Sequence, residues 1–292
     1  MSIFTGSGVA IVTPFNNREI DYDCFEKLIE WQIMLGTDAI VVCGTTGEAS
    51  TLTDEEQVDA VEFTVKVVNK RLPVIAGGGS NDTHHGIHLN KELEQVGADA
   101  LLHVTPYYNK CSQQGLIEHF VSIADAVKIP MIIYSVQGRT GVNIEPNTVL
   151  QLSRHPRIVG IKEASGNIAQ VAEIARLVGD DFDIYSGNDD MIVPLLSLGG
   201  KGAISTVANI IPNELHLLVK NYLDGNVKEA TRMQLKYKPL MDAMFVDVNP
   251  IPVKAALSMM GKVKLEYRLP LCPPDELAMN RIREQMSSFG LI

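Results

Sequence analysis

The sequence predicts an α/β protein, a (β/α)8 TIM barrel with a helical appendage at its C-terminal end. Eight short apolar runs recur at intervals of roughly 20–35 residues, about the length that one strand and its crossover helix require. The runs are continuously apolar rather than alternating, as is typical of parallel strands covered on both faces. Eight such units fit a barrel, whose usual length is about 250 residues. Periodicity alone leaves a doubly wound open sheet as the alternative fold.

The eight predicted strands follow one another in chain order. The first four are VAIVTPF from Val9, AIVVCG from Ala39, PVIAGGG from Pro73 and ALLHVTP from Ala100. The second four are PMIIYS from Pro130, IVGIKEA from Ile158, FDIYSG from Phe182 and GAISTV from Gly202. Most of these runs are rich in β-branched residues, which favour strands.

Amphipathic stretches between these runs predict the helices. Two examples are DYDCFEKLIEWQIML and TDEEQVDAVEFTVKVV. The second opens with Thr53 and Glu56, which have the spacing of a capping box. No linker rich in proline or serine divides the chain, and the part after residue 211 has a helical pattern that predicts two to four helices. We therefore expect a catalytic barrel over residues 1–224 and a helical region over 225–292.

Composition excludes several classes of protein. The chain has 292 residues, a formal charge of −10 and four widely spaced cysteines without a CxxC pair, with a mean hydropathy of +0.08. The acidic balance argues against nucleic-acid and acidic membrane partners. The cysteine spacing argues against a zinc ribbon or a disulfide framework, and it fits a reducing compartment. The amino-terminal residues lack the pattern of a signal peptide. We expect a cytoplasmic protein.

Polar side chains gather where the predicted strands end. In a barrel these ends meet at one face, which is where active sites of this fold lie. The residues there are Thr13, Thr45, Thr46, Ser80, Asn81, Tyr107, Tyr108, Tyr134, Lys162, Ser186, Gly187, Ser205 and Thr206. Neither a carboxylate pair nor a histidine stands among them, which weakens glycosidase and metal-hydrolase interpretations.

Lys162 is the exceptional member of this group because it ends an apolar strand. If it points into the barrel, strand alternation sends its neighbours Ile161 and Glu163 outward, so Glu163 is a poor partner for an ion pair. An inward lysine without a carboxylate neighbour is desolvated, which lowers its pKa. A neutral amine is what attack on a carbonyl to form a Schiff base requires. The alternative is a lysine whose long side chain extends out of the barrel mouth to water.

Three further features have a possible role beside such an amine. Tyr134 ends the preceding strand, where its phenol could transfer protons, especially if it is hydrogen-bonded to Thr45; the alternative is a tyrosine that caps the core. The segment CGTTGEAS offers backbone N–H groups and threonine hydroxyls to a small carboxylate. Arg139, in the loop after Tyr134, suits bidentate capture of a substrate carboxylate, although most single loop arginines are merely exposed.

Together these segments resemble the dihydrodipicolinate synthase family, within the pyruvate-dependent class I aldolases that include N-acetylneuraminate lyase. The resemblance extends over nearly the whole chain. The matching segments are GSGVAIVTPF, GTTGEASTLTDEE, TPYYNK, GIKEASGN and NPIPVKAAL. It implies condensation of pyruvate with L-aspartate 4-semialdehyde to 4-hydroxy-tetrahydrodipicolinate, the first step of the diaminopimelate and lysine branch. Arg139 indicates the synthases rather than the lyases of this group, because the sialic acid and sugar-acid lyases generally lack an arginine there.

The resemblance also implies a role for each site residue. Lys162 forms the Schiff base with pyruvate, and Tyr134, Thr45 and Tyr108 form a proton relay in which Tyr108 comes from a neighbouring subunit. Thr46 helps to hold the pyruvate carboxylate, and Arg139 holds the carboxylate of the semialdehyde. Backbone groups of Gly187 and Ile204 line the pocket. The family needs no metal or organic cofactor, and its usual assembly is a homotetramer built from two tight dimers.

Two departures from the family pattern stand out. Members commonly read Tyr-Asn-Val-Pro before the arginine loop, whereas this chain reads Tyr134-Ser135-Val136-Gln137. Losing the proline removes a constraint on φ, so we expect the loop of Arg139 to sit differently. Lysine-inhibited members place a histidine and a glutamate where this chain has Gln57 and His85, while Asn81 and Tyr107 match. We therefore expect weak or absent inhibition by lysine.

Two other functions are consistent with the same residues. One is a pyruvate lyase that acts on a sialic acid or a 2-keto-3-deoxy sugar acid through the same Lys162 imine. Another is a barrel without catalytic activity that binds a small ligand. His84, His88 and Glu92 have the spacing of a helical metal site. They lie away from the strand ends, so we expect a solvated helix face and no metal.

Overall fold

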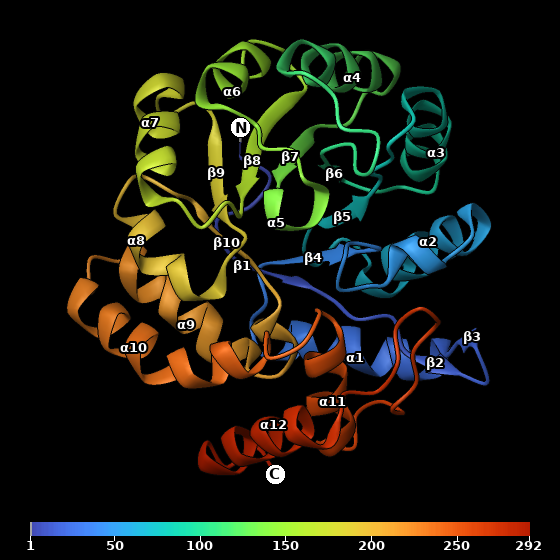
Figure 1. The fold of residues 1–292 in the computed structure, drawn as a ribbon, viewed down its shortest axis with the longest axis vertical. Coiled ribbons are helices and arrows are strands. Elements are labelled where there is room, and N and C mark those ends of the chain that lie inside the picture. Colours follow the sequence, from blue (N-terminus) through green and yellow to red (C-terminus); the bar gives the residue numbers. More distant parts are fainter. Residues whose placement is uncertain (1) are drawn as a thin grey trace.

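A closed eight-stranded barrel forms the centre of the protein (Figure 1). The computed structural model describes residues 2–292. The strands are parallel and close in the order β1-β10-β9-β8-β7-β6-β5-β4, so each neighbours the next barrel strand along the chain. Their bounds are β1 Gly6–Ala10, β4 Ala39–Val42, β5 Val74–Gly77, β6 Ala100–Val104, β7 Met131–Ser135, β8 Ile158–Glu163, β9 Asp183–Ser186 and β10 Gly202–Ser205. The predicted TIM barrel is confirmed.

Helices surround this barrel, and a short hairpin of β2 (Phe15–Asn16) and β3 (Glu19–Ile20) precedes the first helix. The helices up to the end of the barrel are α1 Tyr22–Met34, α2 Asp54–Val68, α3 Thr83–Gln95, α4 Gln113–Ala126, α5 Gln137–Thr140, α6 Pro146–Leu152, α7 Ile168–Val178, α8 Ile192–Leu196 and α9 Pro212–Leu223. Three 3-10 turns are η1 Ala49–Thr51, η2 Asp189–Met191 and η3 Val207–Asn209. At the start of α2 the Thr53 hydroxyl accepts from the Glu56 N–H and the Glu56 carboxylate accepts from the Thr53 N–H, so the predicted capping box is confirmed.

The first strand starts earlier than its apolar run predicts. The run begins at Val9, whereas β1 spans Gly6–Ala10 and pairs Gly6 with Gly202 of β10. Glycine and serine are weak strand formers, so local pattern does not reveal this segment. Pairing with β10 on one side and β4 on the other determines the strand.

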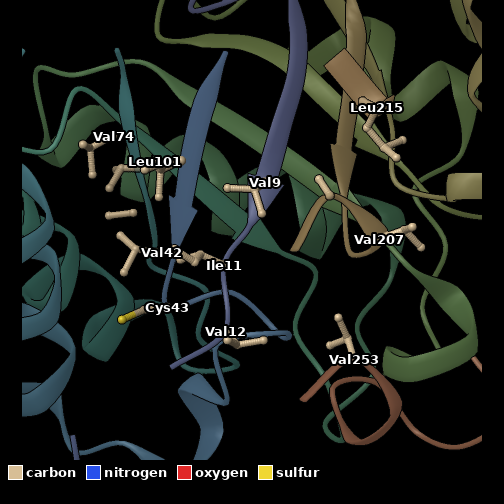
Figure 2. Close-up of a cluster of buried hydrophobic side chains, with 14 of the residues drawn as sticks. Val9, Ile11, Val12, Val42, Cys43, Val74, Leu101, Val207, Leu215 and Val253 are labelled. Carbon is tan, nitrogen blue, oxygen red and sulfur yellow. The ribbon is translucent and has the colours of Figure 1, made fainter. Parts of the chain in front are cut away.

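Alternation along each strand separates an inner from an outer apolar core. On β7, Ile132 and Tyr134 belong to the inner cluster, and Met131 and Ile133 belong to the outer one. The outer cluster fills the space between the strands and the helices. Figure 2 shows part of it, including Val9, Val42, Leu215 and Val253. Burial on both faces explains why the strands read as continuous apolar runs.

The chain after the barrel forms three more helices, α10 Val227–Ala243, α11 Ile251–Met259 and α12 Glu276–Ser288. Helix α12 packs against α10 and α11, and α10 packs against α9 (Figure 1). The predicted helical appendage is therefore confirmed. The position that we expect to divide the two regions, residue 224, lies between α9 and α10.

Two ionic contacts join this appendage to the barrel. Lys254 Nζ of α11 lies 2.5 Å from Glu48 Oε1, and both side chains are fully buried. Arg268 donates to both carboxylate oxygens of Glu56 on α2, at 2.6 Å each.

Within residues 2–292, no helix combines the length and apolar character that a membrane span requires.

Candidate active site

A cavity of about 520 Å³ opens at the carboxyl ends of the barrel strands. Its walls bring together segments from most of the barrel and one from the appendage. Among the predicted site residues, those that line it are Thr45, Thr46, Gln57, His85, Tyr107, Tyr134, Arg139, Lys162 and Gly187. Ile204 lies in the inner apolar cluster of the barrel.

Lys162 lies on β8 in register with Tyr134 on β7. Its Nζ is 4.4 Å from the centre of the Tyr134 ring, and the residue is 6% exposed. Glu163 is buried on the opposite face, where it accepts hydrogen bonds from the Ser165 N–H and from Gln170 Nε2. The neighbouring carboxylate is therefore engaged elsewhere, as strand alternation predicts.

The electrostatic environment makes Lys162 easier to deprotonate than an ordinary lysine. Burial lowers its pKa from 10.5 to about 8, the nearby Asp189 opposes that change, and Arg139 reinforces it. Within residues 2–292 Lys162 forms no ion pair, but the charge of Asp189 acts on it. Asp189 lies in η2, beyond the end of β9, and is not one of the residues at the strand ends.

Asp189, the carboxylate whose charge acts on this amine, is itself buried. Its Oδ2 accepts from the backbone N–H groups of Thr206 and Val207, at 3.2 and 2.9 Å. Its Oδ1 is buried and has no hydrogen-bond partner among residues 2–292. Burial raises the pKa of Asp189, and the hydrogen bonds that its carboxylate accepts, together with the positive charge of Lys162, oppose that rise. The two groups therefore moderate each other's tendency to become neutral.

Gly187 leaves room for the lysine side chain. A Cβ at this position would lie 2.7 Å from Ala164 Cβ and 3.0 Å from Lys162 Cε. Contacts this close would force Lys162 to move. The glycine N–H is already used, because it donates to the Glu163 carbonyl at 2.8 Å. Gly187 lines the cavity and leaves space beside the amine.

Tyr134 provides a protonated phenol next to Lys162. The residue is 7% exposed, and burial raises its pKa to about 12. At neutral pH it is therefore a proton donor until a reacting group takes its proton. The expected hydrogen bond to Thr45 is not present, and the Tyr134 hydroxyl has no hydrogen-bond partner within residues 2–292. Both residues nevertheless line the same cavity.

The GTTG segment presents unused donors to the cavity. The Gly47 N–H donates to the Gly44 carbonyl and the Glu48 N–H donates to the Thr45 carbonyl, which closes a tight turn. The N–H groups of Thr45 and Thr46 make no hydrogen bond within the described chain. Thr45 and Thr46 both line the cavity, so two successive free amides and a threonine hydroxyl are available there to a small carboxylate.

Arg139 is on the one-turn helix α5, which begins at Gln137. Gln137, which replaces the family's proline, is therefore the first residue of a helix. The fixed φ of proline is close to the helical value at this position, so the replacement does not require a different backbone. Arg139 lines the cavity although the family's proline is absent, and its Nη2 donates to the Asn249 carbonyl at 3.1 Å. The guanidinium is exposed and keeps other donors free for a substrate carboxylate.

The four positions of the expected effector site form a group at one side of the same cavity. Gln57, His85 and Tyr107 line it, and Asn81 Nδ2 donates to the Tyr107 carbonyl at 3.1 Å. The Nε2 of His85 lies 2.8 Å from Asp54 Oδ2. The carboxylate of Asp54, which is not one of these four positions, therefore lies beside His85.

Tyr108 stands apart from this cavity. It is 92% exposed and has a positive φ of 71°. Its side chain is therefore exposed to solvent and does not line the cavity of its own barrel. Its expected place in a neighbouring subunit's proton relay stays a prediction.

Two residues of the site, Asp189 and Asn249, are not identified by the sequence pattern. Asn249 lines the cavity from the segment between α10 and α11, and its Nδ2 donates to Thr46 Oγ1 at 2.9 Å. It follows no strand, so the rule that polar residues end strands does not identify it.

Over residues 2–292 no cluster of three or more potential metal ligands is found, and the rings of His84 and His88 contact each other edge to face.

We predict that the rate of imine formation with subsaturating pyruvate rises with pH up to about pH 8 and then levels off. Only the neutral amine attacks, and a group with a pKa of about 8 is roughly one-tenth neutral at pH 7. Single-turnover trapping with borohydride between pH 6 and 10 measures this. A profile that is flat, or one that still rises steeply beyond pH 9.5, would contradict the assignment.

Comparison with known proteins identifies relatives over the whole chain. Residues 3–288 match the model of the dihydrodipicolinate synthetase family. The 4-hydroxy-tetrahydrodipicolinate synthase of Acetivibrio thermocellus is 55% identical over 290 residues, which cover 99% of each chain.

Solved structures of similar proteins have the same fold. The dihydrodipicolinate synthase of Thermotoga maritima superimposes with a TM-score of 0.98 at 41% identity, and the match covers all of both chains. A dihydrodipicolinate synthase from Acinetobacter baumannii in complex with pyruvate gives a TM-score of 0.97 at 41% identity, again over the full length of both chains.

Proposed function

The chain belongs to the dihydrodipicolinate synthetase family, and from that premise we propose that it condenses pyruvate with L-aspartate 4-semialdehyde to form 4-hydroxy-tetrahydrodipicolinate. The observation that carries the proposal is Lys162, a buried amine with a pKa of about 8 that lines the cavity. It lies beside a protonated phenol, and a turn with unused amide donors lines the same cavity.

The first half of the reaction makes a nucleophile from pyruvate. The free N–H groups of Thr45 and Thr46 hold the pyruvate carboxylate, and neutral Lys162 attacks the keto carbon. Tyr134 donates a proton to the developing alkoxide and assists departure of water from the carbinolamine. The resulting iminium loses a proton from its methyl carbon and becomes an enamine. Thr45 and the Tyr108 of a neighbouring subunit complete the route for protons.

The second half joins the two substrates. Arg139 binds the carboxylate of the semialdehyde through paired N–H donors, which places the aldehyde near the enamine carbon. The enamine carbon attacks the aldehyde and forms the new carbon–carbon bond. The amino group of the semialdehyde then attacks the imine carbon, closes the ring and releases Lys162. The sum is one pyruvate and one semialdehyde consumed, with one cyclic product and one water formed.

The remaining features of the proposal concern cofactors, assembly and location. No metal or organic cofactor is required, because the Lys162 iminium itself serves as the electron sink. We propose a homotetramer made of two dimers, supported by the exposure of Tyr108, and solution mass tests it. A cytoplasmic location is supported by the four free cysteines.

Borohydride trapping tests the proposal most directly. Wild-type protein treated with pyruvate and borohydride should gain the mass of one reduced pyruvate adduct per chain, and peptide mapping should locate it at Lys162. Borohydride without pyruvate is the control and should leave the mass unchanged. Failure to form an adduct, or an adduct on another lysine, rejects the imine mechanism.

A pyruvate lyase acting on sialic or 2-keto-3-deoxy sugar acids would use the same imine. Steady-state kinetics with aspartate semialdehyde and with those sugar acids separate the two functions. Arg139 at the cavity favours a substrate with a second small carboxylate. A higher kcat/KM for cleavage of a sugar acid than for the condensation would establish the lyase instead.

Replacing Arg139 with alanine should raise the KM for aspartate semialdehyde by about tenfold or more, as expected for loss of a charge-assisted hydrogen bond. The final yield of the pyruvate adduct at saturating pyruvate should be unaffected, because the imine forms before the aldehyde binds. The kinetic measurement is made at saturating pyruvate. An equal loss of pyruvate labelling would show that Arg139 serves the whole site rather than the second substrate.

We predict weak or absent inhibition by lysine. His85 is engaged with Asp54 and with Ser80 Oγ, and Gln57 supplies no charge to pair with an ammonium group. Initial rates over a range of lysine concentrations measure this, with arginine as a control for general ionic effects. Substantial inhibition at sub-millimolar lysine would contradict it.

A further inference from the structure

Asn249 connects two parts of the proposed site that lie far apart in the sequence. It is in the segment between α10 and α11, lines the cavity and is 7% exposed. Its backbone carbonyl accepts from Arg139 Nη2 at 3.1 Å, and its side-chain Nδ2 donates to Thr46 Oγ1 at 2.9 Å. One residue of the appendage therefore contacts a group proposed for each substrate.

The direction of the side-chain hydrogen bond determines what Thr46 can do. A hydroxyl has one proton to donate and two lone pairs that accept. Because Thr46 Oγ1 accepts from Asn249, its own proton must point elsewhere. The other polar contact that this hydroxyl makes among residues 2–292 is with Thr206 Oγ1 at 3.4 Å, which is long for a bond between hydroxyls. The proton therefore remains available to a stronger acceptor that enters the cavity.

The side-chain amide of Asn249 contacts Thr46 through Nδ2 alone. Its Oδ1 is buried and has no hydrogen-bond partner in the described chain, so the bond to Thr46 is the one polar contact of this amide. Thr46 itself is 2% exposed, and its backbone N–H is unused. A carboxylate oxygen near this N–H could receive both the amide and the hydroxyl proton of the same residue.

We propose that Asn249 is a positioning residue for the first substrate: by donating to Thr46 it directs the Thr46 hydroxyl proton toward the carboxylate of bound pyruvate. This inference rests on the proposed function, because pyruvate is the ligand it concerns. It assigns a part of the substrate site to the C-terminal appendage. It also separates the side chain of Asn249, which acts on pyruvate through Thr46, from its backbone carbonyl, which contacts Arg139.

The test is a double-mutant cycle between Asn249→Ala and Thr46→Val. Asn249→Ala should raise the pyruvate KM by about tenfold, the size expected when one hydrogen bond to a charged ligand is lost. The semialdehyde KM at saturating pyruvate should stay unchanged, because the carbonyl that contacts Arg139 is retained. In the Thr46→Val background the same substitution should add little. Equal effects on both substrates, or fully additive effects, would overturn the inference.

A second variant tests the proton direction even if the alanine variant folds poorly. Asn249→Asp keeps the size of the side chain, but a carboxylate only accepts, so the Thr46 proton must turn to residue 249. The pyruvate KM should rise more than in Asn249→Ala. A pyruvate KM equal to that of the wild type would overturn the inference. Borohydride trapping with the wild type separates the proposed function from the proposed role of Asn249. A pyruvate adduct at Lys162 supports the imine mechanism even if the Asn249 variants have the pyruvate KM of the wild type.

Discussion

Replacing Lys162 with methionine should abolish imine formation and turnover and, at neutral pH, increase the stability of the protein. Methionine has a similar length without a charge. A pKa of about 8 in place of 10.5 means that the folded protein bears a free-energy cost of about 3 kcal/mol at most for keeping the ammonium buried. Urea unfolding at fixed protein concentration, together with borohydride trapping, measures both effects.

The gain in stability should depend on pH in a defined direction. Between about pH 8 and 10.5 the unfolded lysine holds a proton that the folded one has lost, so wild-type stability relative to the variant rises through this window. The advantage of Lys162→Met is therefore largest below pH 8 and shrinks toward pH 10.5. Lys91→Met, on the exposed face of α3, is the control and should change neither activity nor stability appreciably. A pyruvate adduct in the Lys162 variant would refute the role of this lysine.

Replacing Lys254 with methionine should destabilise the protein by about 3–5 kcal/mol, since removal of one partner leaves a buried charge without compensation. The partner is Glu48, whose Oε1 lies 2.5 Å from Lys254 Nζ with both side chains fully buried. Glu48 ends the GTTG turn in a left-handed conformation with a φ of 56°, so the turn that carries Thr45 and Thr46 should also loosen. Urea unfolding and the pyruvate KM report the two consequences.

Two further variants separate loss of the pair from loss of one charge. Glu48→Gln combined with Lys254→Met removes both charges and should recover most of the lost stability. Lys238→Met on α10 breaks an exposed pair with Asp242 and should cost less than about 1 kcal/mol. If the single Lys254 variant were as stable as the Lys238 control, the buried pair would have no structural importance.

Local sequence pattern predicts much of the fold and the central part of the site. Seven of the eight apolar runs coincide with barrel strands, because parallel strands buried on both faces need apolar side chains at every position. The capping box at Thr53 is likewise a local device. The two-residue period of a strand places Lys162 inward and Glu163 outward, so the sequence alone identifies the amine and removes its nearest carboxylate.

The residues that surround this amine depend on contacts that no local pattern contains. Asp189 approaches Lys162 from a 3-10 turn, and Asn249 and Lys254 reach the GTTG turn from an appendage about two hundred residues further along the chain. Which of these side chains meet depends on how α10 and α11 pack against the barrel. The sequence by itself determined the barrel, its reactive lysine and the face on which the site lies. Only the tertiary structure decided the charge beside that lysine and the residues that hold its substrate loops, because both arise from long-range packing.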